Sequence, residues 1–308
     1  METANKWLFI VNPVSGNASS KEVLPQLETQ IAKHGIDAEI VFTEKPGHAS
    51  ELALEYAAKG FRYLIAVGGD GTMNEIVTPL IDRKNIVFGI VPCGTGNDFI
   101  QILGFSDRFD EEQWDVFFAA HTIDMDAGSV NGKYFLNGMG LGFDAQVAAE
   151  NYTEPGVVQQ GGKGKYVWHI VKTLLFYKEK EMSLSLQGKT ENKRLFINTV
   201  ANGRRFAGGF LLTPKAIAND GLLDVCYISK LNLLQRFRIL LMVPKGTHIN
   251  DKKVSYYQCP ELHISFKERM PYHVDGELNF ASEFDIKALP HAVNIIYNHK
   301  GKHFFDQK

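Results

Sequence analysis

The amino-acid sequence predicts two domains: an α/β domain with a mostly parallel sheet, followed by a β-sandwich-like domain. The length of 308 residues allows two hydrophobic cores, since one domain typically takes about 100–200 residues. Strand-like and helix-like segments alternate over residues 1–125, which is typical of a parallel sheet covered by helices on both faces. After residue 126, strand-like runs follow one another with few helices between them, as in antiparallel β domains.

Strands and helices alternate in the expected first domain. Apolar runs or alternating apolar residues predict its strands, at 7–11, 36–42, 61–67 and 86–91. The first helix is expected to begin at a capping Ser19 or Ser20 and to end at Gly35. Apolar residues at helical spacing predict two further helices, at 49–59 and 72–80.

The second domain is expected to consist mainly of strands. Asn131-Gly132 favours a type I′ hairpin turn at its start. Further strands are predicted at 182–186, 194–200, 222–228, 254–257, 262–266, 284–288 and 293–297. Helices at 166–177 and 231–242 interrupt these strands. We therefore place the domains at 1–125 and 126–295, with 296–308 as a segment that can return to the first domain.

The composition excludes several classes of protein. Hydrophobic residues make up 44% and charged residues 22%, which suits a packed protein and not a disordered one. Lys+Arg 33 and Asp+Glu 35 give a net charge of −2, so we expect no nucleic-acid partner. Three widely spaced cysteines exclude a disulfide framework and suit a reducing cytoplasm. No apolar run reaches the roughly 18–20 residues that span a bilayer, so we expect a cytoplasmic protein.

Three glycine-rich turns each follow a predicted strand, at 12–17, 68–75 and 94–98. The carboxyl ends of parallel strands share one edge of a sheet, so these turns are expected to surround a common crevice. Glycines let the main chain approach a phosphate, and free N–H groups at the start of a helix favour an anion. One such turn alone is most often structural. The three together predict a site that binds the phosphate groups of a nucleotide. Neither the GxGxxG motif nor the P-loop motif is present, so the design of this site is a different one.

The second of these turns, GGDGTMNE at 68–75, resembles the GGDGT(x)NE signature of the diacylglycerol kinase catalytic-domain family, which includes sphingosine kinases and bacterial soluble lipid kinases. GGDGT alone is shared with NAD kinases, whereas an ordered set of matches is specific. The supporting matches are NPVSG at 12–16, TEKPGHA at 43–49, PCGTGND at 92–98, the segment from Asp126 to Asp144 with Asn137, Gly140 and Gly142, and VDGE at 274–277.

The resemblance implies the NAD kinase/diacylglycerol kinase-like fold and transfer of the ATP γ-phosphate to a lipid hydroxyl, with ATP and Mg²⁺ as cofactors. The expected acceptor is diacylglycerol, which would give phosphatidic acid. Phosphatidylglycerol, a sphingoid base and NAD are alternative acceptors, and a non-catalytic lipid- or nucleotide-binding module is a further alternative. The lipid substrate implies a protein peripheral to the inner face of the membrane. Exposed apolar edge strands in the second domain are compatible with a homodimer.

The resemblance also assigns roles to individual residues. Glu277 is the expected proton acceptor, with Asp275 beside it, and Asp70 is expected to hold Mg²⁺ or to organise its loop. The expected ATP-binding residues are Asn12, Pro13, Val14, Ser15, Gly16, Thr43, Gly68, Gly69, Asp70, Gly71, Thr72, Met73, Asn74, Thr95, Gly96 and Asn97. The expected metal ligands are Asp98 and, in a second loop, the Asp220 side chain with the carbonyl groups of Ile217 and Leu222.

Two of these assignments have local alternatives. If the DGE segment is extended, the Asp275 and Glu277 side chains point to one face. Each carboxylate then raises the pKa of the other, and burial raises it further. An exposed Asp-Gly turn in a hairpin is the alternative. An Asn-Asp-Gly turn without a metal ion is likewise the alternative for the loop around Asp220.

Overall fold

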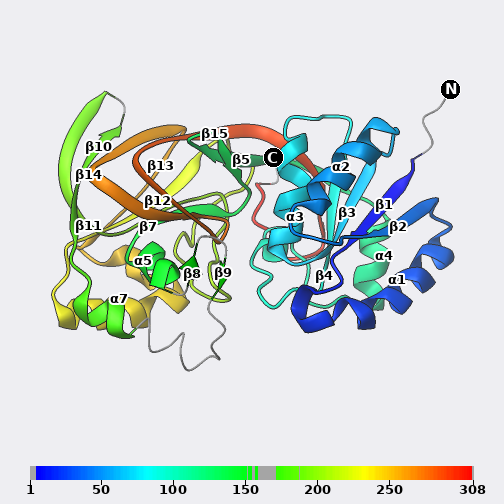
Figure 1. The fold of residues 1–308 in the computed structure, drawn as a ribbon, viewed down its shortest axis with the longest axis horizontal. Coiled ribbons are helices and arrows are strands. Elements are labelled where there is room, and N and C mark those ends of the chain that lie inside the picture. The colour runs from blue at the N-terminus through cyan, green and yellow to red at the C-terminus, as the bar shows by residue number, and fades with distance from the viewer. Residues whose placement is uncertain (1–4, 151, 155–156, 159–170, 187, 307–308) are drawn as a thin grey trace. The chain divides into compact units, whose positions relative to one another are not determined.

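The structure is a computed structural model that describes residues 5–150, 152–154, 157–158, 171–186 and 188–306 (Figure 1). It divides into two compact units. The first unit comprises Met1–Ala127, Ile217–Asp220 and Pro290–Lys308, and the second comprises Gly128–Ala216 and Gly221–Leu289, apart from the residues not described.

A parallel sheet forms the centre of the first unit, in the order β4-β3-β1-β2. Its strands are β1 (Trp7–Val11), β2 (Ala38–Phe42), β3 (Tyr63–Gly68) and β4 (Val87–Pro92). All their pairings are parallel, and Ile295 at the end of the chain pairs with Phe88 of β4 in the same sense. Every residue of β1 and β4 is buried, as expected for strands that are covered on both faces. The turns after β1, β3 and β4 therefore lie at the same edge.

Helices follow the strands of the first unit. They are α1 (Ser20–His34), α2 (His48–Ala58), α3 (Asp70–Val77) and α4 (Glu111–Phe118), with short 3₁₀ turns at Ser15–Ala18, Thr78–Leu80 and Phe99–Gln101. Helix α1 ends as predicted at Gly35, whose φ of 63° suits glycine. Ser19, one of the two predicted cap residues, is the N-cap residue of α1, but its side chain makes no capping hydrogen bond to the helix.

Antiparallel strands dominate the second unit. They are β6 (Lys133–Phe135), β7 (Gly138–Gly142), β10 (Lys180–Leu186), β11 (Lys189–Ala201), β12 (Leu223–Ser229), β13 (Val254–Cys259) and β14 (Glu261–Val274), with a small pair formed by β8 (Tyr152–Glu154) and β9 (Val157–Val158). Strands β5 (Thr122–Val130) and β15 (Glu277–Ile296) each run along the chain from one unit into the other.

Long, bulged strands give the second unit its closed packing. Strand β7 pairs with both β11 and β14, and β10 pairs with the same two strands, so the four strands close a ring. Bulges occur at 195/197 in β11 and at 265/270 in β14. Apolar side chains from these strands form one core of the unit, with Phe135, Leu141 and Phe284 fully buried.

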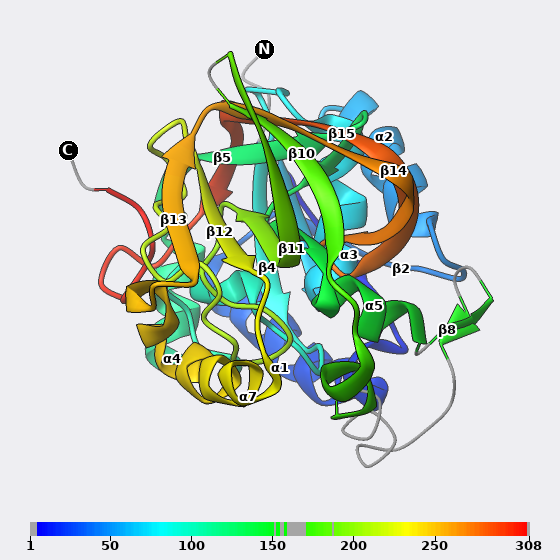
Figure 2. The same ribbon diagram turned by 90° about the vertical axis from the view of Figure 1, so that its left-hand side faces the viewer.

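Two helices and a helical segment pack on the strands of the second unit (Figure 2). Helix α5 covers Phe143–Glu150 and α7 covers Leu233–Met242. Asn232 and Gln235 form a capping box that begins α7 close to the predicted position. Of the predicted helix at 166–177, residues 171–176 are helical and 166–170 lie outside the described residues. A second apolar core, which includes Phe143, Leu174 and Ile239, lies beneath these helices.

Candidate functional site

The three glycine turns of the first unit contact one another at the carboxyl edge of the parallel sheet. Asn12 Nδ2 in the first turn donates a hydrogen bond to Thr72 Oγ1 in the second at 3.1 Å. The main-chain N–H of Cys93, at the third turn, donates to the carbonyl of Gly68 at 2.9 Å. Ser19 Oγ, just after the first turn, donates to the Cys93 carbonyl at 2.6 Å. The three turns thus form one connected group, which we call the glycine rim.

Some glycines of the rim are needed for the turns to pack together. A Cβ atom on Gly16, whose φ is 58°, would lie 1.9 Å from the Cys93 carbonyl oxygen. A Cβ atom on Gly94 would lie 2.6 Å from Gly69 Cα. Main-chain atoms cannot approach a Cβ atom so closely without moving. The sequence suggested that these glycines leave room for phosphate, but their first effect is to let the turns touch.

Two other glycines of the rim leave an open face. A Cβ atom on Gly71 or on Gly96 would meet no atom within 4 Å, and both residues are exposed. Thr95, beside Gly96, is also exposed. Gly71 lies in the first turn of α3, where main-chain N–H groups have no partner within the helix. These positions offer the main chain to an anion such as a phosphate group.

Asp70 links the second turn to the third. Its Oδ2 accepts a hydrogen bond from the main-chain N–H of Asp98 at 2.9 Å, and its Oδ1 accepts one from that of Phe99 at 3.2 Å. Phe99 begins a short 3₁₀ turn, whose first N–H groups favour a negative charge. The geometry supports the second of the two predicted roles for Asp70, that of organising the loop.

Other predicted ATP-binding residues lie on or beside the rim. Asn12 Oδ1 accepts from the Val14 N–H at 3.2 Å, which shapes the first turn, and Val14 is 78% exposed. The Thr43 N–H donates to the Val11 carbonyl at 2.9 Å, so Thr43 lies next to that turn. Met73 is 1% exposed and belongs to the core, so only its main chain is available to a nucleotide.

The remaining rim residues hold the turns in shape. Asn97 Nδ2 donates to the Gly94 carbonyl at 3.2 Å, within the third turn. Asn74 Oδ1 accepts from Thr78 Oγ1 at 3.0 Å, one helical turn further along. Burial raises the pKa of the Cys93 thiol to about 11, so this cysteine is protonated at neutral pH and acts as a packing residue.

The DGE segment forms a hairpin in the second unit. Val274 pairs with Glu277, so Asp275 and Gly276 are the two residues of the turn between β14 and β15. Both have positive φ, 45° and 89°, as a type I′ turn requires. The hairpin alternative is therefore correct about the local backbone.

The Asp275 side chain nevertheless makes long-range contacts. Its Oδ1 accepts from the N–H groups of Asn137 at 3.1 Å and Gly138 at 2.8 Å, and its Oδ2 accepts from that of Leu136 at 2.7 Å. Burial raises the pKa of Asp275 to about 6, although these three donors act in the opposite direction. The expected contribution of burial is therefore confirmed, whereas Glu277 does not contribute to the raised pKa. Glu277 is exposed at the first position of β15.

Near this hairpin, the structure brings together two residues that sequence reasoning did not pair. His273 Nε2 and Asp144 Oδ2 lie 3.2 Å apart, and both side chains are mostly buried. A Cβ atom on Gly140 would lie 2.2 Å from each of these two atoms. Gly140 therefore leaves the space that the pair occupies. No local pattern identifies His273, because its partner is 129 residues away in the chain.

The predicted metal loop is anchored within the first unit. The Ala218 carbonyl accepts from the Asp126 N–H at 2.8 Å, and the Ala218 N–H donates to the Phe304 carbonyl at 2.9 Å. Asn219 exchanges two hydrogen bonds with the main chain of Asp306. Ile217, Asp220 and Leu222 are all half-buried. Among the described residues, no three His, Cys, Asp or Glu side chains gather as metal ligands, so a site here needs carbonyl donors.

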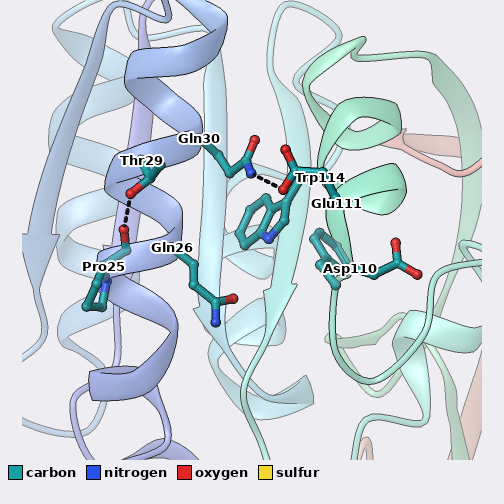
Figure 3. A pocket seen from close by; sticks show the side chains of 8 residues that line it. Pro25, Gln26, Thr29, Gln30, Asp110, Glu111 and Trp114 are labelled. Carbon is teal, nitrogen blue, oxygen red and sulfur yellow. Dashed lines mark hydrogen bonds between the residues drawn. The ribbon is translucent and has the colours of Figure 1, made fainter.

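A separate surface pocket of about 400 Å³ lies on the first unit between α1 and α4 (Figure 3). Gln30 Nε2 donates across it to Glu111 Oε2 at 2.8 Å, and Trp114 forms part of its wall. The pocket shares no residue with the glycine rim, and we assign it to the packing of these helices.

Comparison with known proteins gives matches over most of the chain. The family described as the diacylglycerol kinase catalytic domain matches residues 6–130, and the YegS C-terminal NAD kinase beta sandwich-like domain matches residues 138–297. Diacylglycerol kinase from Bacillus subtilis (strain 168) is 32% identical over 282 residues, covering 87% of this chain and 88% of that protein. Diacylglycerol kinase from Staphylococcus carnosus (strain TM300) is 28% identical over 272 residues, covering 87% of each.

A solved structure supports the same fold. It is described as a diacylglycerol kinase from Bacillus anthracis str. Sterne, and it covers 96% of this chain and 97% of its own, with a TM-score of 0.71 and 21% identity. Together with the family matches, this likeness confirms the predicted α/β domain and β-sandwich-like domain. In the described part of the chain, no helix combines the length and the apolar character that crossing a membrane requires.

Proposed function

The chain belongs to the diacylglycerol kinase catalytic-domain family and is a lipid kinase, and we propose from this premise that its acceptor is diacylglycerol. The acceptor hydroxyl oxygen forms a bond to the γ-phosphorus of ATP, and the bond from that phosphorus to the β,γ-bridging oxygen breaks. The products are phosphatidic acid and ADP. The likeness to relatives named diacylglycerol kinase supports this acceptor. The observation that supports the ATP site is the glycine rim, with its open faces at Gly71 and Gly96.

The glycine rim is proposed to hold the phosphate groups of ATP. Phosphoryl transfer depends chiefly on positioning and on stabilising the charge of the transferred group. Main-chain N–H groups near Gly71 and Gly96 suit both tasks, because both glycines are exposed and a Cβ atom on either would meet no atom within 4 Å. Asp70 keeps the second and third turns in register through its bonds to the Asp98 and Phe99 N–H groups.

We assign Mg²⁺ to the carboxylates of the glycine rim. The Asp70 carboxylate binds the main-chain N–H of Asp98, so the two residues are neighbours, and hard oxygen donors suit this cation. Bound Mg²⁺ would neutralise phosphate charge. Asp220, with the carbonyl groups of Ile217 and Leu222, is proposed as a second Mg²⁺ site. All three residues are half-buried, and hard oxygen donors suit Mg²⁺, which supports this assignment.

Glu277 is proposed as the proton acceptor for the lipid hydroxyl. It is exposed, so its carboxylate is accessible to a substrate. Asp275 has both carboxylate oxygens bound by main-chain N–H groups, so we assign it to positioning the hairpin that carries Glu277. This changes the role expected for Asp275 from the sequence, in which it stood beside Glu277 as a catalytic carboxylate.

A panel of acceptors tests the proposed function. The full chain is incubated with radiolabelled ATP and Mg²⁺, and with mixed micelles that contain diacylglycerol, phosphatidylglycerol or sphingosine. NAD is added in a separate reaction without lipid. We expect labelled phosphatidic acid to be the main product. Preferential labelling of another lipid would replace the proposed acceptor, and labelling of NAD alone would overturn the proposal.

A further inference from the structure

Helix α7 and the segment before β10 expose an unusual amount of apolar surface. Six of the ten exposed large hydrophobic side chains among the described residues lie in these two stretches. Leu234 is 82% exposed, Leu241 is 77% exposed and Phe176 is 73% exposed. We call the six residues the α7 face; they are Leu175, Phe176, Leu233, Leu234, Phe237 and Leu241. A cluster of this kind marks an interaction site more often than scattered exposed residues do.

Helix α7 is apolar on two opposite sides. Ile239 is 2% exposed and packs into the core of the second unit, whereas Leu234, Phe237 and Leu241 follow one another at helical spacing on the exposed side. A helix that is apolar on both sides is normally buried in a core or in contact with a membrane. Since one side already packs on the protein, the exposed side is available to a partner.

The two stretches of the α7 face are held together by a buried arginine. Arg236 donates to the carbonyl of Leu174 at 2.6 Å and to that of Tyr177 at 2.8 Å. The same guanidinium pairs with Glu179 at 2.8 Å, where both side chains are 9% exposed. The capping box at Asn232 fixes the start of α7. The face is therefore preformed, and a partner would not have to order it.

Positive charges border the α7 face. Lys178 follows the first stretch, Lys230 precedes α7 and Lys245 follows it, and all three are exposed. Helix α7 itself contains two arginines and no acidic residue. One of them, Arg238, is exposed and pairs with Asp251. Apolar side chains bordered by cations match a surface whose interior is apolar and whose boundary is anionic.

We propose that the α7 face docks on the surface of an anionic lipid bilayer, and this inference rests on the proposed lipid kinase function. The leucine and phenylalanine side chains enter the boundary between headgroups and acyl chains, and the lysines contact anionic headgroups. A second copy of the chain fits the face less well, because joining two copies through it would bring lysines of like charge together. Docking would bring the enzyme to the membrane that holds its lipid acceptor.

Vesicle flotation tests the docking directly. The full chain is mixed with vesicles of phosphatidylcholine alone or with about one third phosphatidylglycerol, and bound protein is measured after flotation. We expect binding to the anionic vesicles, and we expect Leu234→Glu or Leu241→Glu to lower the partition coefficient about tenfold or more. Leu54→Glu is the matched control, since Leu54 is an exposed leucine on α2 of the first unit. Thermal unfolding checks that all variants fold.

Three outcomes would overturn the inference. The first is vesicle binding by Leu234→Glu that equals that of the wild type and of Leu54→Glu. The second is an equal loss of vesicle binding in all variants, Leu54→Glu included. The third is a change from dimer to monomer in Leu234→Glu without loss of vesicle binding. Activity separates this inference from the proposed function. On a short-chain diacylglycerol dissolved as monomers, Leu234→Glu should match the wild type, whereas on vesicles it should be slower. If no acceptor is phosphorylated by any variant, the proposed function fails, while flotation still decides the docking.

Discussion

Asp70 Oδ2 accepts a hydrogen bond from the main-chain N–H of Asp98 at 2.9 Å, so one carboxylate ties the second glycine turn to the third. The Asp70→Asn substitution removes the charge and leaves one of the two N–H groups facing an amide donor. We expect kcat/KM to fall about 100-fold, because small displacements of phosphate-binding groups are costly to phosphoryl transfer. We expect the free energy of unfolding to fall by about 1–3 kcal/mol.

Kinase assays and urea unfolding measure these two effects of Asp70→Asn. Asp37→Asn is the control, because Asp37 is an exposed aspartate of the same unit and lies outside the glycine rim. An Asp70→Asn enzyme as active as the Asp37→Asn enzyme would remove Asp70 from the proposed machinery.

Two glycines of the rim should respond oppositely to alanine. Gly94→Ala places a Cβ atom 2.6 Å from Gly69 Cα, so we expect the free energy of unfolding to fall by about 1–3 kcal/mol. Gly71→Ala meets no atom and lies in α3, so we expect stability to rise by up to about 1 kcal/mol. Gly71→Ala should nevertheless weaken ATP binding, because the new methyl group covers the open face. Urea unfolding measures the stability of both variants, and titration calorimetry measures their affinity for ATP. Unchanged ATP affinity in Gly71→Ala would argue against a phosphate contact at Gly71.

The contribution of Asp275 to stability should depend on pH. Its folded-state pKa of about 6 lies above the ordinary value of 3.8, so the folded state binds more protons than the unfolded state between these values. Stability from this group is fully present below pH 3.8 and is lost as the pH rises through 6. The difference in unfolding free energy between wild type and Asp275→Asn should therefore shrink from pH 4 to pH 7.

Urea unfolding at several pH values measures that difference. The Glu283→Gln variant serves as a control, since Glu283 is an exposed residue of the same hairpin strands. A wild-type advantage that grows with pH would mean that the three N–H donors outweigh burial at Asp275.

Glu277→Gln should reduce turnover without affecting the fold. Loss of a general base typically lowers the rate about 10²–10⁴-fold, and an exposed glutamate contributes little to packing. Glu283→Gln, at another exposed position of β15, should keep wild-type activity. The comparison uses initial rates on mixed micelles, with thermal unfolding to check stability. Equal rates for Glu277→Gln and Glu283→Gln would exclude Glu277 as the base.

The sequence was sufficient to predict features that depend on local pattern or on strand order. The convergence of the three turns followed from parallel strands, and the Asn131-Gly132 hairpin followed from its dipeptide, whose residues both have positive φ in the structure. No helix is predicted at the position of α4. Its start depends on the Asp110 side chain, which accepts from the Gln113 N–H.

Contacts between residues that are far apart in the chain could not be predicted from the sequence. The three N–H donors of Asp275 lie 137–139 residues away, and no periodicity connects them to it. The clash that makes Gly16 necessary also involves a residue remote in the chain, Cys93. Local motifs therefore identify these residues, but they do not show that the same glycines and carboxylates also hold the turns together.

The pair formed by His273 and Asp144 gives a last prediction, on coupling within the second unit. Gly140→Ala puts a methyl group 2.2 Å from both side-chain atoms, and we expect it to lower the free energy of unfolding by about 1–3 kcal/mol. His273→Ala opens space beside the new methyl group, so the double variant should be more stable than the sum of the two single effects predicts. Urea unfolding of the four proteins gives the coupling energy, which we expect to be about 0.5–3 kcal/mol. Strict additivity would show that Gly140 is required for the backbone of β7 and not for the space that this pair occupies.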